Sequence, residues 1–164
     1  MSVEEYLHTQ FDGSDREYLD GEVAERNMGE LPHAILQAQL AHRLLVLAET
    51  LHLRVLTEIR VQVSPTRFRV ADVAAWRGGD IGHRIPTVPP FLVVEILSAE
   101  DRLVRMQPKI QEYLSIGVEY VWLIDPEERR ALVYSQQVPG GRLEEVLRTE
   151  NPRIEILLAS VLPA

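Results

Sequence analysis

The segment PPFLVVEILSAEDR at residues 89–102 decides the fold, because it contains a strand that the rest of the chain must surround. Residues 91–97 form an apolar run that only Glu95 interrupts. A continuous apolar run is typical of a central strand that is covered on both faces of its sheet. An unpaired carboxylate buried there costs several kcal/mol, so Glu95 needs a partner, a proton or a metal ion.

The segments around this strand predict a mixed sheet. We expect further strands at residues 54–63, 68–76 and 119–125, with a Gly/Pro-rich loop leading into the run at 91–97. An amphipathic helix from about residue 101 to 116 connects that run to the strand at 119–125. A helical crossover of this kind implies that the two strands it joins are parallel.

Four other segments complete the expected architecture. Asp20-Gly21 lies between short alternating runs and predicts an N-terminal β-hairpin. Leucines recur at helical spacing in residues 29–52, where Pro32 suits the first turn. The runs RALVYSQ and RLEEVLR flank Pro139-Gly140-Gly141 and predict a second hairpin, and residues 153–164 an edge segment packed on the core.

Length and composition limit the class of protein. The 164 residues, 46% of them hydrophobic, predict a single α/β domain over residues 1–164. No apolar stretch is long enough to span a membrane, and the first residues lack the features of a signal peptide. The chain has no cysteine, which excludes disulfides, thiolate metal sites and cysteine nucleophiles. We therefore expect a cytoplasmic protein with no membrane partner.

The net charge of −8 argues against long-range attraction to nucleic acid, which depends on Lys and Arg. A local basic patch or a bound divalent cation can reverse the sign of the charge at a particular site.

Asp72 is the second carboxylate in an apolar strand. It shares a face with Val70 and Ala74, as Glu95 does with Val93 and Leu97. If the two strands pair with these faces together, both acids come within reach of one Mg²⁺ or Mn²⁺ ion, which oxygen ligands suit. The alternative is that each acid meets a Lys, an Arg or backbone amides.

Lys109 is the only lysine in the chain and lies on the crossover helix, on the face of Arg105, Met106 and Tyr113. From there its ammonium group could reach the two acids, where it would hold an attacking water or stabilise developing charge. The alternative is an ordinary solvated lysine.

The runs RVADVAAW, PPFLVVEILSAEDR and KIQEYLSIGVEYVWLIDP, in this order and spacing, resemble the Uma-type family of putative restriction endonucleases. This family belongs to the PD-(D/E)XK nuclease superfamily, and the resemblance runs from about residue 14 to 135. It implies a restriction-endonuclease-like fold, a mixed sheet flanked by helices.

The resemblance also implies site residues. Asp72 matches the aspartate of the "PD" and Glu95 the acid of the "(D/E)XK", which makes both metal ligands. The superfamily lysine would stand at Leu97, but the Uma-type pattern has it on the following helix, where Lys109 matches it. Ala71 replaces the usual proline. The family has a histidine at the start of the first helix, and superfamily members often bring a glutamate from this region to the metals. His33 and Glu30 are therefore additional site candidates, although each could simply serve the helix N-terminus.

We therefore expect a Mg²⁺- or Mn²⁺-dependent endonuclease that hydrolyses phosphodiester bonds in nucleic acid, with DNA as the expected substrate and RNA left open. A homodimer is expected, since nucleases of this type pair to reach both strands. The alternative is a catalytically inactive nuclease-fold module that acts as a nucleic-acid- or protein-binding scaffold.

Overall fold

The computed structural model describes residues 1–27, 29–99, 101 and 103–164. The helices are α1 (Val3–His8), α2 (Leu31–Leu51) and α3 (Leu103–Ser115), followed by a final 3₁₀ turn at Leu158–Ser160. The strands are β1 (Glu17–Leu19), β2 (Glu22–Ala24), β3 (Leu53–Ser64), β4 (Arg67–Arg77), β5 (Leu92–Ile96), β6 (Tyr120–Asp125), β7 (Arg130–Ser135), β8 (Arg142–Leu143), β9 (Val146–Thr149) and β10 (Ile154–Leu157).

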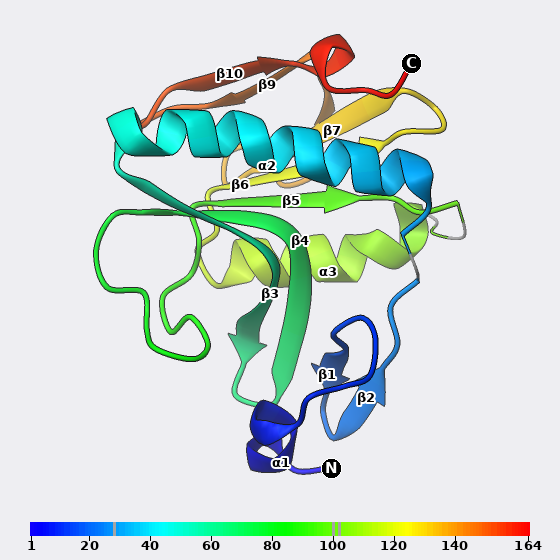
Figure 1. Ribbon diagram of the computed structural model, residues 1–164, viewed down its shortest axis with the longest axis vertical. Coiled ribbons are helices and arrows are strands. Elements are labelled where there is room, and N and C mark those ends of the chain that lie inside the picture. The colour runs from blue at the N-terminus through cyan, green and yellow to red at the C-terminus, as the bar shows by residue number, and fades with distance from the viewer. Residues whose placement is uncertain (28, 100, 102) are drawn as a thin grey trace.

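Eight of the strands form one mixed sheet in the order β2-β1-β4-β5-β6-β7-β8, and β3 pairs with β4 (Figure 1). The central strand is β5, which runs antiparallel to β4 and parallel to β6. The expected mixed α/β sheet, the central strand and the parallel crossover through α3 are thus confirmed. No described helix is long and apolar enough to cross a membrane.

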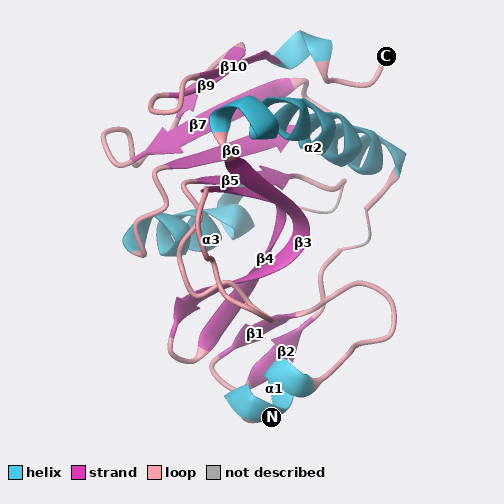
Figure 2. Ribbon diagram, turned by 60° about the vertical axis from the view of Figure 1, so that its left-hand side comes forward, coloured by secondary structure: helices cyan, strands magenta, loops and turns pink. Residues whose placement is uncertain are grey.

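The two longer helices cover opposite faces of the sheet (Figure 2). Leu40 and Leu44 of α2 pack against Val94 on one face, whereas Ile110 and Tyr113 of α3 belong to the cluster on the other. Consecutive residues of β5 point to opposite faces, so this strand is apolar on both. The physical reason for the unbroken apolar run in the sequence is therefore burial between two helices.

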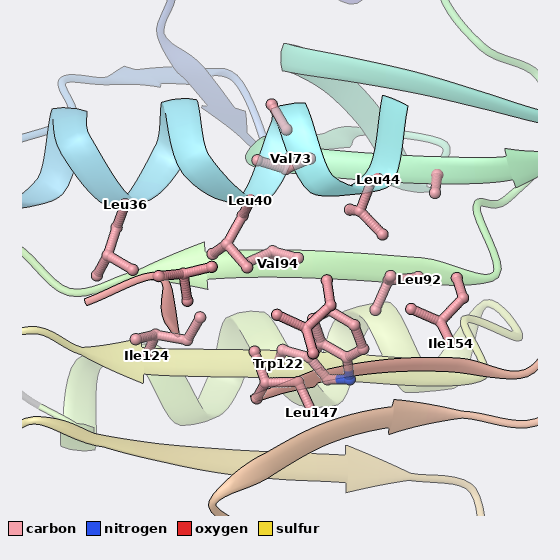
Figure 3. Close-up of a cluster of buried hydrophobic side chains, with 14 of the residues drawn as sticks. Leu36, Leu40, Leu44, Val73, Leu92, Val94, Trp122, Ile124, Leu147 and Ile154 are labelled. Atoms are coloured by element: carbon pink, nitrogen blue, oxygen red, sulfur yellow. The ribbon is translucent and has the colours of Figure 1, made fainter. Parts of the chain in front are cut away.

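The cluster beneath α2 is completed by the C-terminal segment (Figure 3). Trp122 of β6 is fully buried at its centre, and Leu147 and Ile154 reach it from β9 and β10. These two strands form a separate antiparallel pair. The tail therefore packs on the core, as expected.

The second predicted hairpin is only partly correct. β7 pairs with β8 over Leu132↔Leu143 and Val133↔Arg142, but β8 contains two residues. The rest of RLEEVLR leaves the large sheet and forms β9 with β10. Leu147 becomes completely buried through this change of sheet. Its burial therefore does not require the β7–β8 hairpin to continue.

The N-terminal hairpin has the expected form, because Asp20 and Gly21 both have positive φ, 53° and 102°. Two such residues favour the tight turn whose twist matches antiparallel strands. Helix α1 was not expected from the sequence. Ser2 and Glu5 form a capping box for it, and Tyr6 fixes it by burial against Tyr18 and Phe68.

The divergence of β4 from β5 creates the site. The two strands pair from Ala75↔Leu92 to Val73↔Val94, after which β4 curves toward β1 and pairs with it at Arg67 and Phe68 (Figure 2). The pairing stops just where the two acids stand, so polar side chains take the place of the backbone ladder.

The α2 core offers a matched test of this packing. Replacing fully buried Leu40 with Ala should lower the free energy of unfolding by about 2–5 kcal/mol, because it leaves a cavity. Leu45→Ala, on the exposed side of the same helix, should change it by less than about 0.5 kcal/mol. Urea denaturation measures both, and equal effects would contradict the assignment of the buried face.

Candidate active site

A pocket of about 220 Å³ opens where β4 and β5 separate, between α3 and the segment that follows β2. Its lining includes four of the five residues expected from the sequence: His33, Asp72, Glu95 and Lys109. The acids come from neighbouring strands, the histidine from the first turn of α2 and the lysine from α3. The structure therefore brings these four residues together from four different elements.

Asp72 is only 2% exposed, and both of its carboxylate oxygens have partners. Oδ2 accepts the backbone N–H of Ile96 at 2.7 Å and lies 3.3 Å from Nε2 of His33. Oδ1 accepts a hydrogen bond from Nη2 of Arg26 at 2.7 Å. Burial alone would raise the pKa of Asp72, but the hydrogen bond from His33 and the charge of Arg26 hold it below its usual value.

Glu95 is as buried as Asp72, and its carboxylate accepts hydrogen bonds from one neutral and one charged donor. The Tyr113 hydroxyl donates to Oε1 at 2.8 Å, and the Lys109 ammonium lies 3.0 Å from Oε1 and 3.1 Å from Oε2. Burial raises the pKa of Glu95 to about 7, with Lys109 opposing the rise and Asp72 adding to it. Glu95 is thus the carboxylate of the site that can exchange a proton near neutral pH.

Lys109 is a buried ammonium that holds three strands together. Besides Glu95, it donates to the carbonyl oxygen of Val70 at 2.9 Å and contacts Oε1 of Glu17 at 2.8 Å. Burial would lower the pKa of Lys109, but the charges of Glu95 and Glu17 outweigh it and raise the pKa. The lysine is therefore protonated and not solvated.

Three residues that contact Asp72, Glu95 or Lys109 directly were not expected from the sequence. Glu17 of β1 is buried between Lys109 and Arg69, which lower its pKa to about 2 against the effect of burial. Tyr113, expected only in the apolar stripe of α3, also binds Glu95. Arg26 follows β2 and pairs with Asp72. Tyr113 lies one helical turn after Lys109, a spacing that could have indicated it; no local pattern indicates the other two.

Glu30 does not join this cluster. It is exposed just before α2 and lines an adjacent pocket of about 210 Å³ with His33 and Asp125. Glu58 contributes to the site indirectly, because it pairs with Arg26 and accepts a hydrogen bond from Gln37 at 2.7 Å.

The donor chemistry of Asp72 and Glu95 fits a hard divalent cation, since both offer carboxylate oxygens. Each of these oxygens already accepts at least one hydrogen bond from the protein. Within the described part of the chain, no three His, Asp or Glu side chains are grouped to hold a metal ion. A cation at Asp72 would thus take the place of a present donor, and Arg26 is the charged one on Oδ1.

The pKa of Glu95 makes stability depend on pH. A carboxyl whose pKa is raised on folding stabilises the folded state at low pH, and this contribution is lost as pH rises through 7. The glutamine of the Glu95→Gln variant cannot ionise. As pH rises from 5 to 8, the free energy of unfolding of this variant should therefore increase relative to that of wild type, by on the order of 3 kcal/mol. Urea unfolding at both pH values measures this, and a relative loss would show that Glu95 is ionised at little cost.

The family model Uma2, described as "Putative restriction endonuclease", matches residues 3–162. The chain is similar in fold to the crystal structure of a putative nuclease belonging to DUF820 from Anabaena variabilis, with a TM-score of 0.84 and 19% identity over 99% of this chain and 97% of that one. No curated protein matches. The chain therefore belongs to the Uma2 family of putative restriction endonucleases.

Proposed function

We propose that this protein is a metal-dependent endonuclease that hydrolyses phosphodiester bonds in DNA, with residues 1–164 acting as one restriction-endonuclease-like domain. The observation that carries the proposal is the convergence of Asp72, Glu95 and Lys109 on one pocket from two strands and a helix. Membership of a family of putative restriction endonucleases supports the same reaction class.

Asp72 and Glu95 would hold one or two Mg²⁺ or Mn²⁺ ions. Such an ion polarises a phosphoryl oxygen and lowers the pKa of a bound water. In the hydrolysis, the oxygen of water bonds to phosphorus, the bond from phosphorus to one ester oxygen breaks, and that oxygen takes up a proton. The proton that the attacking water loses balances the one that the leaving oxygen gains.

Lys109 would stabilise the negative charge that develops on the phosphoryl group. Its pKa is raised, so it carries the needed positive charge at neutral pH. The contacts to Glu17 and Val70 fix its position before substrate arrives. Fixed dipoles and charges of this kind are most effective where water is excluded, and Lys109 is only 7% exposed.

His33 contributes to the proposed site through its contact with Asp72. Burial would lower the pKa of His33, but its hydrogen bond to Asp72 and the charge of that acid raise it. A protonated His33 would orient Asp72 and face the phosphate. Glu30 lines the adjacent pocket, and its proposed part is limited to the rim of the site.

Arg105 extends the proposed nucleic-acid surface. It is exposed on α3, one turn before Lys109, and lines the same pocket. We further propose that two copies pair in the cytoplasm to act on both strands of a duplex. The large sheet has free edges at β3 and β8, which could form strand pairs.

One observation favours a second candidate function. All oxygens of Asp72 and Glu95 have protein donors, so the cluster is already neutralised by Arg26, Lys109 and His33. A nuclease fold stabilised in this way could serve as an inactive binding scaffold, and the net charge of −8 agrees with that reading.

Metal binding separates the two functions. Calorimetric titration with Mn²⁺ should give binding to wild type that disappears in Asp72→Asn and Glu95→Gln, because each loses a charged oxygen ligand. Both variants should also lose at least about 10²-fold of the Mg²⁺-dependent rate on plasmid DNA, since the metal provides several kcal/mol of transition-state stabilisation.

Glu119→Gln is the matched control for this experiment. Its carboxylate is half-exposed, pairs with Arg77 and lies outside the pocket, so metal binding and cleavage should stay at wild-type level. Circular dichroism must show that all variants are folded. Wild type that binds no Mn²⁺ at millimolar concentration would favour the scaffold instead.

DNA affinity should depend on Arg105. In EDTA, where cleavage is suppressed, Arg105→Gln should weaken the binding of a labelled duplex and reduce the slope of log K against log salt by about 1, as for one phosphate contact. Arg142→Gln removes an exposed arginine from β8 and should leave the slope unchanged. Fluorescence anisotropy at several salt concentrations measures both; equal slopes for Arg105→Gln and wild type would exclude this contact.

A further inference from the structure

Arg26 holds a position that the proposed reaction does not explain. It follows β2, and its side chain is only 14% exposed. One end of its guanidinium donates to Oδ1 of Asp72 at 2.7 Å, and the other pairs with Glu58. An arginine that neutralises a buried carboxylate in this way avoids the large cost of leaving that charge uncompensated.

The two oxygens of Asp72 differ in what could replace their partners. Oδ2 is fixed by the backbone N–H of Ile96, which cannot leave without disturbing β5. Oδ1 is bound by the end of a flexible side chain. A divalent cation that binds Asp72 would therefore compete with Arg26 for Oδ1, because two cations at one oxygen repel each other.

Glu58 provides a place for the displaced arginine. Its carboxylate is held by Gln37 and is 41% exposed, so it can retain the guanidinium at the rim. Its φ of 51° makes it the one non-glycine residue within a described strand that adopts the left-handed region. This conformation is unfavourable for a residue with a side chain and persists only where surrounding interactions enforce it.

Asn27 anchors the same segment at a second point. Its side-chain amide donates to Oδ1 of Asp101 at 2.7 Å, while Oδ2 of Asp101 accepts the backbone N–H and the hydroxyl of Ser98. The backbone beside Arg26 is thus attached to the end of β5 independently of Asp72. Release of Asp72 would require the side chain of Arg26 to turn, and not the whole segment to leave.

We propose that Arg26 is a built-in occupant of the divalent-cation position at Asp72, which the metal must displace toward Glu58 before the site is complete. The inference rests on the proposed metal-dependent function and goes beyond it by naming the group that opposes metal binding. On this proposal, the free energy of metal binding is the gain from ligation of the ion less the cost of breaking the Arg26–Asp72 pair.

Removing the competitor should strengthen metal binding. In a calorimetric titration with Mn²⁺, Arg26→Gln should bind at least about fivefold more tightly than wild type, a coupling of ordinary size between two competing groups. Arg26→Lys, which keeps the charge on a more compact group, should bind with affinity between the two. Arg142→Gln controls for the loss of a positive charge as such, because this exposed arginine lies on β8 outside the pocket, and should change affinity less than twofold.

Thermal unfolding gives a second readout, because metal that binds the folded state raises the Tm by an amount set by its affinity. Without metal, Arg26→Gln should melt below wild type, since Asp72 loses its counter-ion, and Mn²⁺ should raise its Tm by more than it raises that of wild type. The double variant Arg26→Gln/Asp72→Asn should recover stability without metal and should not respond to Mn²⁺.

The outcomes distinguish this inference from the proposed function. If Asp72→Asn abolishes Mn²⁺ binding but Arg26→Gln binds no more tightly than wild type, the competitor is excluded and the metal site stands. If Arg26→Gln weakens DNA binding without changing Mn²⁺ affinity, Arg26 is instead a phosphate contact. If neither wild type nor Arg26→Gln binds Mn²⁺, both proposals fail and the Arg26–Asp72 pair is structural.

Discussion

The structure depends on one buried ammonium group. Lys109 of α3 contacts Glu95 of β5, Glu17 of β1 and the carbonyl of Val70 in β4, so a single side chain joins the crossover helix to three strands. The strands separate at this point, and the contacts of the lysine hold them together where backbone hydrogen bonds between β4 and β5 have ended. Burying a charge here is tolerable only because two carboxylates surround it.

The same balance extends over the whole cluster. Three buried acids, Glu17, Asp72 and Glu95, face three cations, Arg26, Arg69 and Lys109. The near-complete pairing lowers the pKa of two of the acids, whereas burial, only partly opposed by Lys109, raises the pKa of Glu95. Replacing a buried ion pair by well-packed apolar side chains is often neutral or stabilising. Stability of the fold therefore does not by itself account for the polar cluster, which agrees with the proposed active site.

The sequence indicated the sheet well because its strongest signals are local. The apolar run that contains Glu95 must be covered on both faces, and α2 and α3 cover them. The crossover through α3 required parallel β5 and β6. The departure of β9 from the large sheet was missed because it depends on burial of Leu147 among distant residues. Helix α1 was missed although Ser2 and Glu5 supply a local capping-box signal, because the helix is short and is fixed by burial of Tyr6.

By itself, the sequence determined which residues carry unusual chemistry: two acids in apolar strands and one lysine on the helix between strands. The faces of Asp72 and Glu95 followed from the two-residue period of a strand. Only the tertiary structure decided their partners. Glu17 and Arg26 come from a hairpin and its following segment, far along the chain from α3 and β4, and pair there because the curve of β4 brings them close. Local pattern fixes which way a side chain points along its own element, but long-range packing decides which charge it meets.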